Sequence, residues 1–469
     1  PDVGFTDRYR VPYQFAKIVN RSLSLDNIVL ESKSTQIRDS SNEWFDDLSG
    51  SYGVNLFGYD FYKECMRQGN LLTDKLGPVL GPYHPVILDV SEKLREISGL
   101  DQVSFHMSGT EAVMQAVRLA RYHSGRKKTV QFCGAYHGWW DGVQPGPGNP
   151  RNGDDVYTLR DMHKNTLRVL RTRKDIACVL INPIQGLHPN ANPPSDATLM
   201  DSSRRAKFDR VAYGTWLREV AGVCKERGIV FIVDDIFTGF RLAKGGAQEY
   251  FGIEADLVTY GKTLGGGLPV GVLCGRREFM RRFEPQRPGR ICFARGTFNA
   301  HPQVMVAMNE FLKRLDALTV DLDYEFLDAK WNERTAQWNA AFEKNDLPVR
   351  VENMSSVFTV FYSKPSRFNW LYQFYLRDAG ILLSWVGTGR LIFAHDCSQE
   401  HFDAIVQKSI IAGLSMAADG WWDNVPELDN KAIKKRVARE IVNACWKRLW
   451  VPRSAGVLPS SRPRPLAPE

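Results

Sequence analysis

Between about residues 86 and 283, apolar strand-like runs alternate with segments whose apolar residues recur at helical spacing. Such alternation is typical of parallel strands joined by crossover helices, so we predict an α/β fold with a mainly parallel sheet. The clearest strand-like runs cover residues 103–107, 129–132, 177–181, 229–233 and 255–260, and the clearest helical segments cover residues 111–122 and 213–226.

Polar and glycine-rich motifs follow the first two of these runs. Ser108, Gly109 and Thr110 open a helix and offer backbone amides, hydroxyls and a positive helix end, all suited to a phosphate. Tyr136 and His137 follow the second run and add aromatic surface. Taken singly, these motifs are simply a helix cap and a packed loop. Because ligands bind at the carboxyl ends of strands in such sheets, we predict that the motifs share one site.

Lys262 lies between an apolar strand-like run and a cluster of glycines, and Asp234 ends another apolar run. A lone lysine is usually a surface charge, and a lone aspartate after a strand is as often an N-cap. Together, an amine for an imine and a fixed carboxylate for a ring nitrogen are what catalysis with pyridoxal 5'-phosphate (PLP) requires. We therefore predict Lys262 and Asp234 as catalytic residues that bind PLP.

Composition narrows the class of protein. The chain has 469 residues, 43% of them hydrophobic and 24% charged, as in globular proteins. No apolar run approaches the roughly 20 residues of a membrane span, and no signal-peptide pattern opens the chain, so we predict a cytoplasmic protein without a membrane partner. The net charge of +8 is dispersed, which favours a solvated basic face over a nucleic-acid partner.

Eight cysteines are scattered without a CxxC pair, so we expect buried thiols in a reducing compartment and no metal site. The chain begins with Pro1, and the missing initiator Met leads us to expect processing, tag removal or excision from a longer polypeptide.

Residues 234–271 resemble the class III aminotransferases of PLP fold type I, most closely the glutamate-1-semialdehyde aminomutase branch. The resemblance extends through residues 108–112, 136–138 and 296–302 and covers about residues 40–415. It implies a large domain with a mainly parallel seven-stranded sheet between helices, and a smaller α+β domain from both termini. The expected divisions are 1–78 (small-domain segment), 79–310 (large PLP-binding domain), 311–425 (C-terminal small domain) and 426–469 (basic helix and flexible Pro/Arg-rich tail).

The resemblance also implies roles for individual residues. Lys262 would form the imine and later move a proton, while Asp234 would hold the pyridine nitrogen. Ile236 and Tyr136 would lie against opposite faces of the ring. Thr297 would reach the phosphate of the neighbouring subunit, which implies a homodimer with shared active sites. The full expected cofactor-binding set is Ser108, Gly109, Thr110, Tyr136, His137, Asp234, Ile236, Lys262 and Thr297.

Three positions depart from the family pattern. Asp235 and Asn182 stand where the family usually has glutamate, and Phe237 stands where some relatives have a glutamine for the cofactor's phenolic oxygen. Asn182 removes a charge near the substrate, so the substrate or the reaction type is expected to differ from the common case.

The resemblance predicts transfer of an amino group from a small-molecule amine donor to a keto or aldehyde acceptor, through pyridoxamine phosphate. An intramolecular aminomutase is the alternative, and a noncatalytic scaffold is a third interpretation that the intact Lys262 and Asp234 disfavour. Residues 51–58 and 76–78 resemble aminotransferase domains of polyketide and nonribosomal peptide synthases, so an acyl or peptidyl carrier protein in secondary metabolism is a candidate partner. The sequence does not identify the donor or the acceptor.

Overall fold

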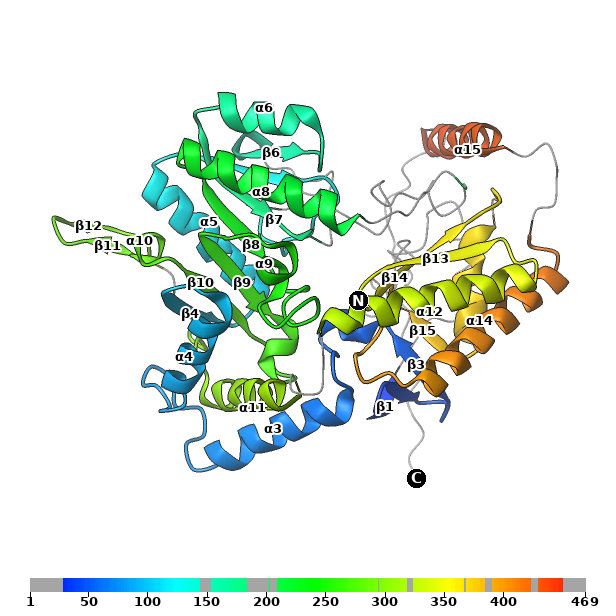
Figure 1. Cartoon of the computed structure of the whole chain (residues 1–469), viewed down its shortest axis with the longest axis horizontal. Helices are drawn as coiled ribbons and strands as arrows, with labels where there is room; N and C mark the ends of the chain where they lie inside the picture. Colours follow the sequence, from blue (N-terminus) through cyan, green and yellow to red (C-terminus); the bar gives the residue numbers. More distant parts are fainter. Residues whose placement is uncertain are drawn as a thin grey trace.

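The computed structural model describes residues 28–143, 153–183, 202, 209–293, 295–318, 324–366, 368–383, 390–422 and 429–449. The end of the predicted C-terminal tail, from residue 450, lies outside these ranges. The described chain forms two lobes, a larger one built around a twisted sheet and a smaller one built around two short sheets (Figure 1).

A seven-stranded sheet forms the centre of the larger lobe. Six of its strands point the same way, and β10 alone runs antiparallel to both of its neighbours. The sheet therefore confirms the mainly parallel architecture. In spatial order the strands are β4 (Gln102–His106), β10 (Gly271–Gly275), β9 (Leu257–Gly261), β8 (Val230–Asp234), β7 (Ile176–Ile181), β5 (Lys128–Phe132) and β6 (Val156–Leu159).

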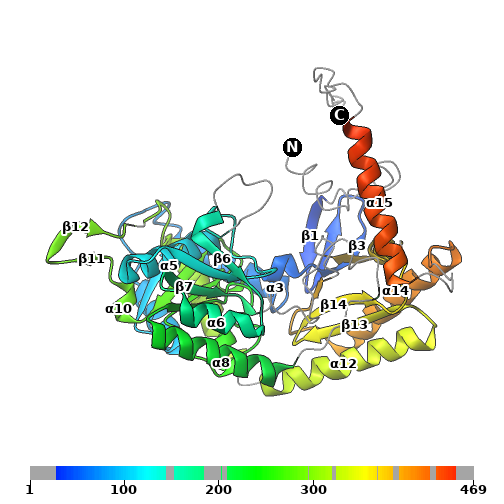
Figure 2. The same cartoon turned by 90° about the horizontal axis from the view of Figure 1, so that it is seen from above.

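The central strands are apolar because helices cover both faces of the sheet. Every residue of β7, β8 and β9 is buried, as in other doubly covered parallel sheets. Helix α5 covers one face and helices α6 and α8 cover the other (Figures 1 and 2). The helices of this lobe are α4 (Ile87–Ser98), α5 (Gly109–Ser124), α6 (Lys164–Thr172), α8 (Arg210–Arg227), α9 (Gly246–Phe251) and α10 (Arg277–Met280).

The predicted strands agree with β4, β5, β7, β8 and β9 to within one or two residues, and the two predicted helices lie inside α5 and α8. Strand β10 was not predicted. It lies between β9 and β4 and pairs glycine against glycine at Gly271 and Gly261. This antiparallel return follows the glycine-rich turn after Lys262.

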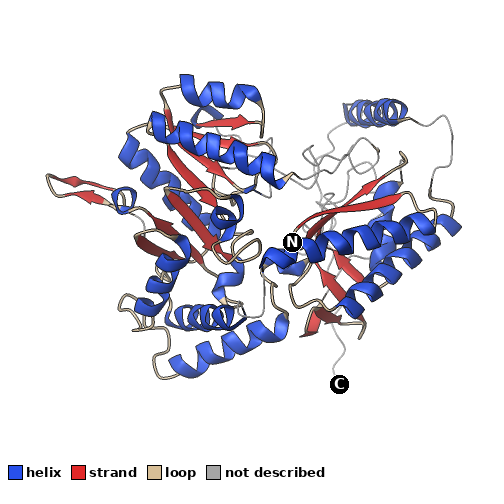
Figure 3. Ribbon diagram, in the orientation of Figure 1, coloured by secondary structure: helices blue, strands red, loops and turns tan. Residues whose placement is uncertain are grey.

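The smaller lobe combines segments from both ends of the described chain. Strand β15 (Ile381–Leu383) pairs in parallel with β3 (Trp44–Leu48). In the same sheet β3 pairs antiparallel with β2 (Gln36–Asp39), and β2 pairs antiparallel with β1 (Val29–Lys33). A second sheet contains β13 (Val349–Met354), β14 (Val357–Tyr362) and β16 (Arg390–Ile392). The helices of the smaller lobe are α12 (Tyr324–Lys344), α13 (Tyr372–Asp378) and α14 (Gln399–Ala418) (Figure 3).

Two helices join the lobes, and two elements project from them. Helices α3 (Tyr59–Thr73) and α11 (Pro302–Leu318) pack side by side beneath the large sheet (Figure 1). The hairpin of β11 (Phe283–Glu284) and β12 (Arg287–Ile291) extends away from the larger lobe, and α15 (Asn430–Leu449) extends from the smaller one (Figure 2). Among the described residues, none of the helices has the length and apolar content needed to cross a membrane.

Candidate active site

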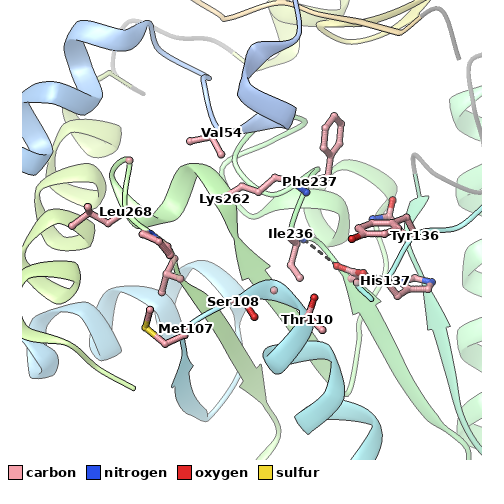
Figure 4. A pocket seen from close by; sticks show the side chains of 17 residues that line it. Val54, Met107, Ser108, Thr110, Tyr136, His137, Ile236, Phe237, Lys262 and Leu268 are labelled. Carbon is pink, nitrogen blue, oxygen red and sulfur yellow. Dashed lines mark hydrogen bonds and ion pairs between the residues drawn. The ribbon is translucent and has the colours of Figure 1, made fainter. Parts of the chain in front are cut away.

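A cavity of about 430 Å³ opens at the carboxyl ends of the parallel strands. This volume is within the usual range for small-molecule sites. Figure 4 shows the lining side chains converging from different strand ends, with Val54 coming from a distant part of the sequence. Eight of the nine predicted cofactor-binding residues line the cavity: Ser108, Gly109, Thr110, Tyr136, His137, Asp234, Ile236 and Lys262.

Lys262 directly follows β9, as predicted, and begins a short 3₁₀ turn (Lys262–Gly265). Burial is the main cause that lowers the pKa of its amine; with Asp234 raising this pKa and the charges of Arg390 and Arg241 lowering it, the result is about 8. The Lys262 side chain extends toward Phe237, and its Nζ lies 5.2 Å from the centre of that ring (Figure 4). A substantial fraction of this amine is therefore neutral and nucleophilic near pH 8.

Asp234 is the last residue of β8 and is almost fully buried. Its carboxylate accepts a hydrogen bond of 2.7 Å from His137 Nδ1 and one of 3.3 Å from the hydroxyl of Thr259. The backbone N–H of Ile236 donates to the same carboxylate at 3.3 Å. These donors hold the carboxylate at the cavity wall and compensate for its burial.

The start of α5 forms a close-fitting cradle. Ser108 is the N-cap, and its hydroxyl accepts a hydrogen bond from Glu111 N. A Cβ atom added at Gly109 would lie 2.6 Å from Ile236, and one added at Gly138 would lie 2.4 Å from the hydroxyl of Thr110. Glycine is therefore required at both positions for the loops to approach each other. The helix start leaves positive backbone N–H groups facing the cavity, which suits an anion.

The two residues predicted to lie against the faces of the cofactor ring come from different loops. Tyr136 lines the cavity and is half exposed. Ile236 lines it from the β8 side and packs against the Gly109 backbone. A tyrosine ring and an isoleucine side chain both suit contact with an aromatic ring, so this lining is compatible with the predicted roles of the two residues.

Thr297 does not line the cavity and is exposed. It follows the projecting hairpin, outside its own subunit's site. Its predicted role in a neighbouring subunit stays a prediction.

The three residues that differ from the family pattern have different structural environments. Asp235 points away from the cavity, accepts hydrogen bonds from the Thr238 hydroxyl and Ala247 N, and holds the loop that follows β8. Burial raises the pKa of Asp235 to about 7. Asn182 and Phe237 both line the cavity. Asn182 is buried, so an uncharged amide occupies this part of the wall.

Arg390, which the sequence analysis did not single out, lies on the small-domain strand β16 and is almost fully buried. Its guanidinium carbon lies 5.6 Å from the centre of the Phe237 ring, and its charge lowers the pKa of Lys262. Val54 was missed as well. Neither residue carries a local sequence signal, because Val54 reaches the cavity, and Arg390 reaches the Phe237 ring that lines it, only through the packing of the small lobe against the large one.

The geometry defines a PLP-dependent enzyme of fold type I. A solved transaminase with PLP bound shares this fold, with a TM-score of 0.70 and 23% identity over 85% of this chain and 93% of that chain. An omega-transaminase from Sphaerobacter thermophilus has a TM-score of 0.69 and 23% identity, and the match covers 88% of this chain and 99% of that chain.

The chain belongs to the class III aminotransferase family. The family profile described as "Aminotransferase class-III" matches residues 31–143 and 209–409. A curated relative, glutamate-1-semialdehyde 2,1-aminomutase of Methanococcus maripaludis (strain C7 / ATCC BAA-1331), is 34% identical over 352 residues, which are 71% of this chain and 76% of the relative. The protein is thus a PLP-dependent transaminase of class III, and the lysine, carboxylate and glycine cradle described above fit its cofactor.

Proposed function

We propose that this protein moves an amino group from a small amine donor to a keto or aldehyde acceptor, with Lys262 and Asp234 as the catalytic residues. The observation that carries the proposal is the meeting of three groups in one cavity: an amine with a lowered pKa, a buried carboxylate held by His137, and the N-terminus of α5. Bound PLP supplies an aldehyde for condensation with amines and an electron-withdrawing ring.

Each of these residues then has a definite task. The neutral amine of Lys262 takes a proton from the carbon that bears the amino group and returns it elsewhere. Asp234 keeps a proton on the cofactor's ring nitrogen, and His137 fixes the orientation of that carboxylate. Tyr136 and Ile236 hold the two faces of the ring, while Gly109 and Thr110 hold the phosphate.

The charges around the cavity favour a substrate that carries a carboxylate. Two buried arginines, Arg390 and Arg241, act electrostatically on Lys262, and Asp234 is the carboxylate that opposes them. Asn182 contributes an uncharged amide, so the part of the cavity wall that it forms adds no negative charge. We infer that Arg390 is the residue that faces the substrate's carboxylate.

The second candidate function is an intramolecular aminomutase, which the name of the relative at 34% identity favours. The two functions predict different cofactor spectra when the enzyme is given a single substrate. A transaminase given only an amine donor accumulates pyridoxamine phosphate until an acceptor is added. An aminomutase given its substrate returns to the starting spectrum without an added keto acid.

We also propose a homodimer in which Thr297 of one subunit reaches the phosphate in the other, as in the family pattern. Its exposed position after the projecting hairpin supports this. An acyl or peptidyl carrier partner, a role in secondary metabolism and a cytoplasmic location stay predictions from the sequence.

The substitution Lys262→Ala tests the central assignment. We expect turnover to fall by about 10²–10⁴-fold, because the proton-transfer group is lost. Borohydride should fix the cofactor covalently to the wild-type protein but not to this variant, which mass spectrometry of the intact chain measures. Lys313→Ala, which removes an exposed lysine of α11, is the matched control and should behave as wild type. Covalent labelling of the Lys262→Ala variant would show that another lysine binds the cofactor.

A further inference from the structure

Lys262 has an unusual backbone conformation. Its φ angle is +49°, in the left-handed region that residues other than glycine, asparagine and aspartate rarely adopt. Such a conformation costs on the order of 1–3 kcal/mol and persists only where surrounding contacts enforce it. The contacts that can enforce it are those on the turn that Lys262 begins, whose next residue is Thr263.

The contact that holds Thr263 comes from the N-terminal part of the chain. The Tyr62 hydroxyl, on α3, is hydrogen-bonded to the Thr263 hydroxyl, and both side chains are buried. The backbone N–H of Leu56 donates to the same Tyr62 oxygen at 3.0 Å. Since the Leu56 N–H occupies an acceptor position of that oxygen, the Tyr62 hydrogen is available to Thr263. The turn after Lys262 is thereby tied to a segment about two hundred residues earlier in the sequence.

Close packing restricts the rest of the turn that follows Lys262. Gly266 and Gly267 both have positive φ angles, +58° and +96°. A Cβ atom at Gly266 would lie 2.5 Å from the carbonyl oxygen of Ala307 on α11, and one at Gly267 would lie 3.1 Å from Met66 Sδ on α3. The turn is therefore pressed between the two helices that pack side by side (Figure 1). Within this clamp, the Tyr62 hydroxyl supplies the directional contact.

We propose that Tyr62 is a positioning residue for Lys262: its hydroxyl holds Thr263, and through it holds the Lys262 backbone in the left-handed conformation that directs the amine into the cavity. This inference rests on the proposed function of Lys262. The segment that carries Tyr62 also supplies Val54 to the cavity, so the same part of the chain shapes the pocket and orients the lysine. Tyr62 itself is not among the residues that line the cavity, so we assign it a positioning role and not a catalytic one.

The test compares Tyr62→Phe with a control that loses an equally buried hydroxyl elsewhere. Tyr372→Phe is that control, because the Tyr372 hydroxyl is buried in the small lobe, where it donates to Ser409 O at 2.7 Å. In the full-length protein freed of cofactor, acylation of Lys262 by an amine-selective reagent is followed against pH by peptide mass spectrometry. Near-ultraviolet circular dichroism checks that each variant is folded.

In the wild type, we expect the acylation midpoint near the Lys262 pKa of about 8. Tyr62→Phe should raise this midpoint by about 1 pH unit, because a lysine released from the clamp gains solvent. In the cofactor-loaded enzyme, the same variant should lower kcat by about tenfold with little change in KM. Tyr372→Phe should lose thermal stability without moving the midpoint.

Two Thr263 variants keep the test decisive if Tyr62→Phe does not fold. Thr263→Val removes the other partner of the hydrogen bond and should raise the midpoint as Tyr62→Phe does. Thr263→Ser keeps a hydroxyl and should retain the wild-type midpoint. A Tyr62→Phe midpoint equal to that of the wild type, with the stability loss of the control, would overturn the positioning role. Because acylation requires no turnover, this outcome is separate from failure of the proposed reaction.

Discussion

Two adjacent carboxylates, Asp234 and Asp235, show how side-chain environment separates roles at the residue scale. Asp234 faces the cavity, where His137 and Thr259 donate hydrogen bonds to it. Asp235 faces the protein interior, where Thr238 and Ala247 donate to it. Burial is the main cause that raises the pKa of Asp235 to about 7; the neighbouring charge of Asp234 adds to the rise, and the hydrogen bonds from Thr238 and Ala247 oppose it. The sequence shows two aspartates in a row, while the strand geometry assigns them to opposite sides.

This raised pKa predicts a pH-dependent cost to stability. The folded state keeps a proton on Asp235 up to about pH 7, whereas the unfolded chain loses it near 3.8. The free energy of unfolding therefore falls as pH rises through this window. Asp235→Asn should make that fall shallower: the loss in the free energy of unfolding between pH 5 and 8 should be smaller by roughly 2–3 kcal/mol than in the wild type. Urea unfolding at several pH values measures it.

The control for this experiment is Asp154→Asn, which removes an exposed carboxylate and should leave the pH dependence unchanged. A slope identical in Asp235→Asn and the wild type would mean that Asp235 is ionised in the folded protein at pH 5.

At the scale of elements, the reversed strand β10 brings the phosphate cradle and the lysine turn together. Gly271, its first residue, pairs with Gly261 at the end of β9 and with His106 at the end of β4. A Cβ atom at Gly271 would lie 2.0 Å from the carbonyl oxygen of Ser108. The close approach of β10 to the start of α5 therefore depends on glycine.

Gly271→Ala should disrupt this approach. We expect a loss of about 1–3 kcal/mol in the free energy of unfolding, because the added methyl group forces β10 or the Ser108 backbone to move. PLP affinity should fall by about tenfold or more, since the same backbone forms the cradle. Urea unfolding and PLP titration measure the two effects.

Gly222→Ala is the matched control. Gly222 is exposed in α8, and a Cβ atom there would meet no other atom within 4 Å, so alanine should stabilise the helix by about 0.5–1 kcal/mol. Equal behaviour of the two alanine variants would contradict the close approach.

At the scale of the whole molecule, buried Arg241 joins the two lobes. It follows β8 in the larger lobe and donates to Ser356 Oγ at 2.8 Å and to Phe393 O at 2.7 Å in the smaller one. Its own carbonyl oxygen lies 3.0 Å from His395 Nε2. Burial lowers the pKa of Arg241 to about 10, so it still carries a charge at neutral pH. This charge contributes to the positive potential at the cavity.

The proposed sharing of the active site between two subunits predicts complementation between two inactive variants. Lys262→Ala lacks the catalytic amine, and Thr297→Ala should lose PLP readily. Heterodimers formed from the two should recover about half of the wild-type activity, because one of the two sites then combines an intact Lys262 with the partner's intact Thr297. Activity and PLP retention after subunit exchange measure this. No recovery in verified heterodimers would place the action of Thr297 within its own subunit.

The sequence by itself determined the features that depend on short stretches of chain. Apolar periodicity located strands and helices of the larger lobe, and the motifs at strand ends located seven of the predicted residues that line the cavity, because parallel strands bring their carboxyl ends to one edge. The family resemblance added Ile236. Tertiary structure alone decided which distant groups act on them. The reversed direction of β10, the approach of Arg390 and Val54, and the bond between Tyr62 and Thr263 depend on packing between segments far apart in sequence, for which no local pattern exists.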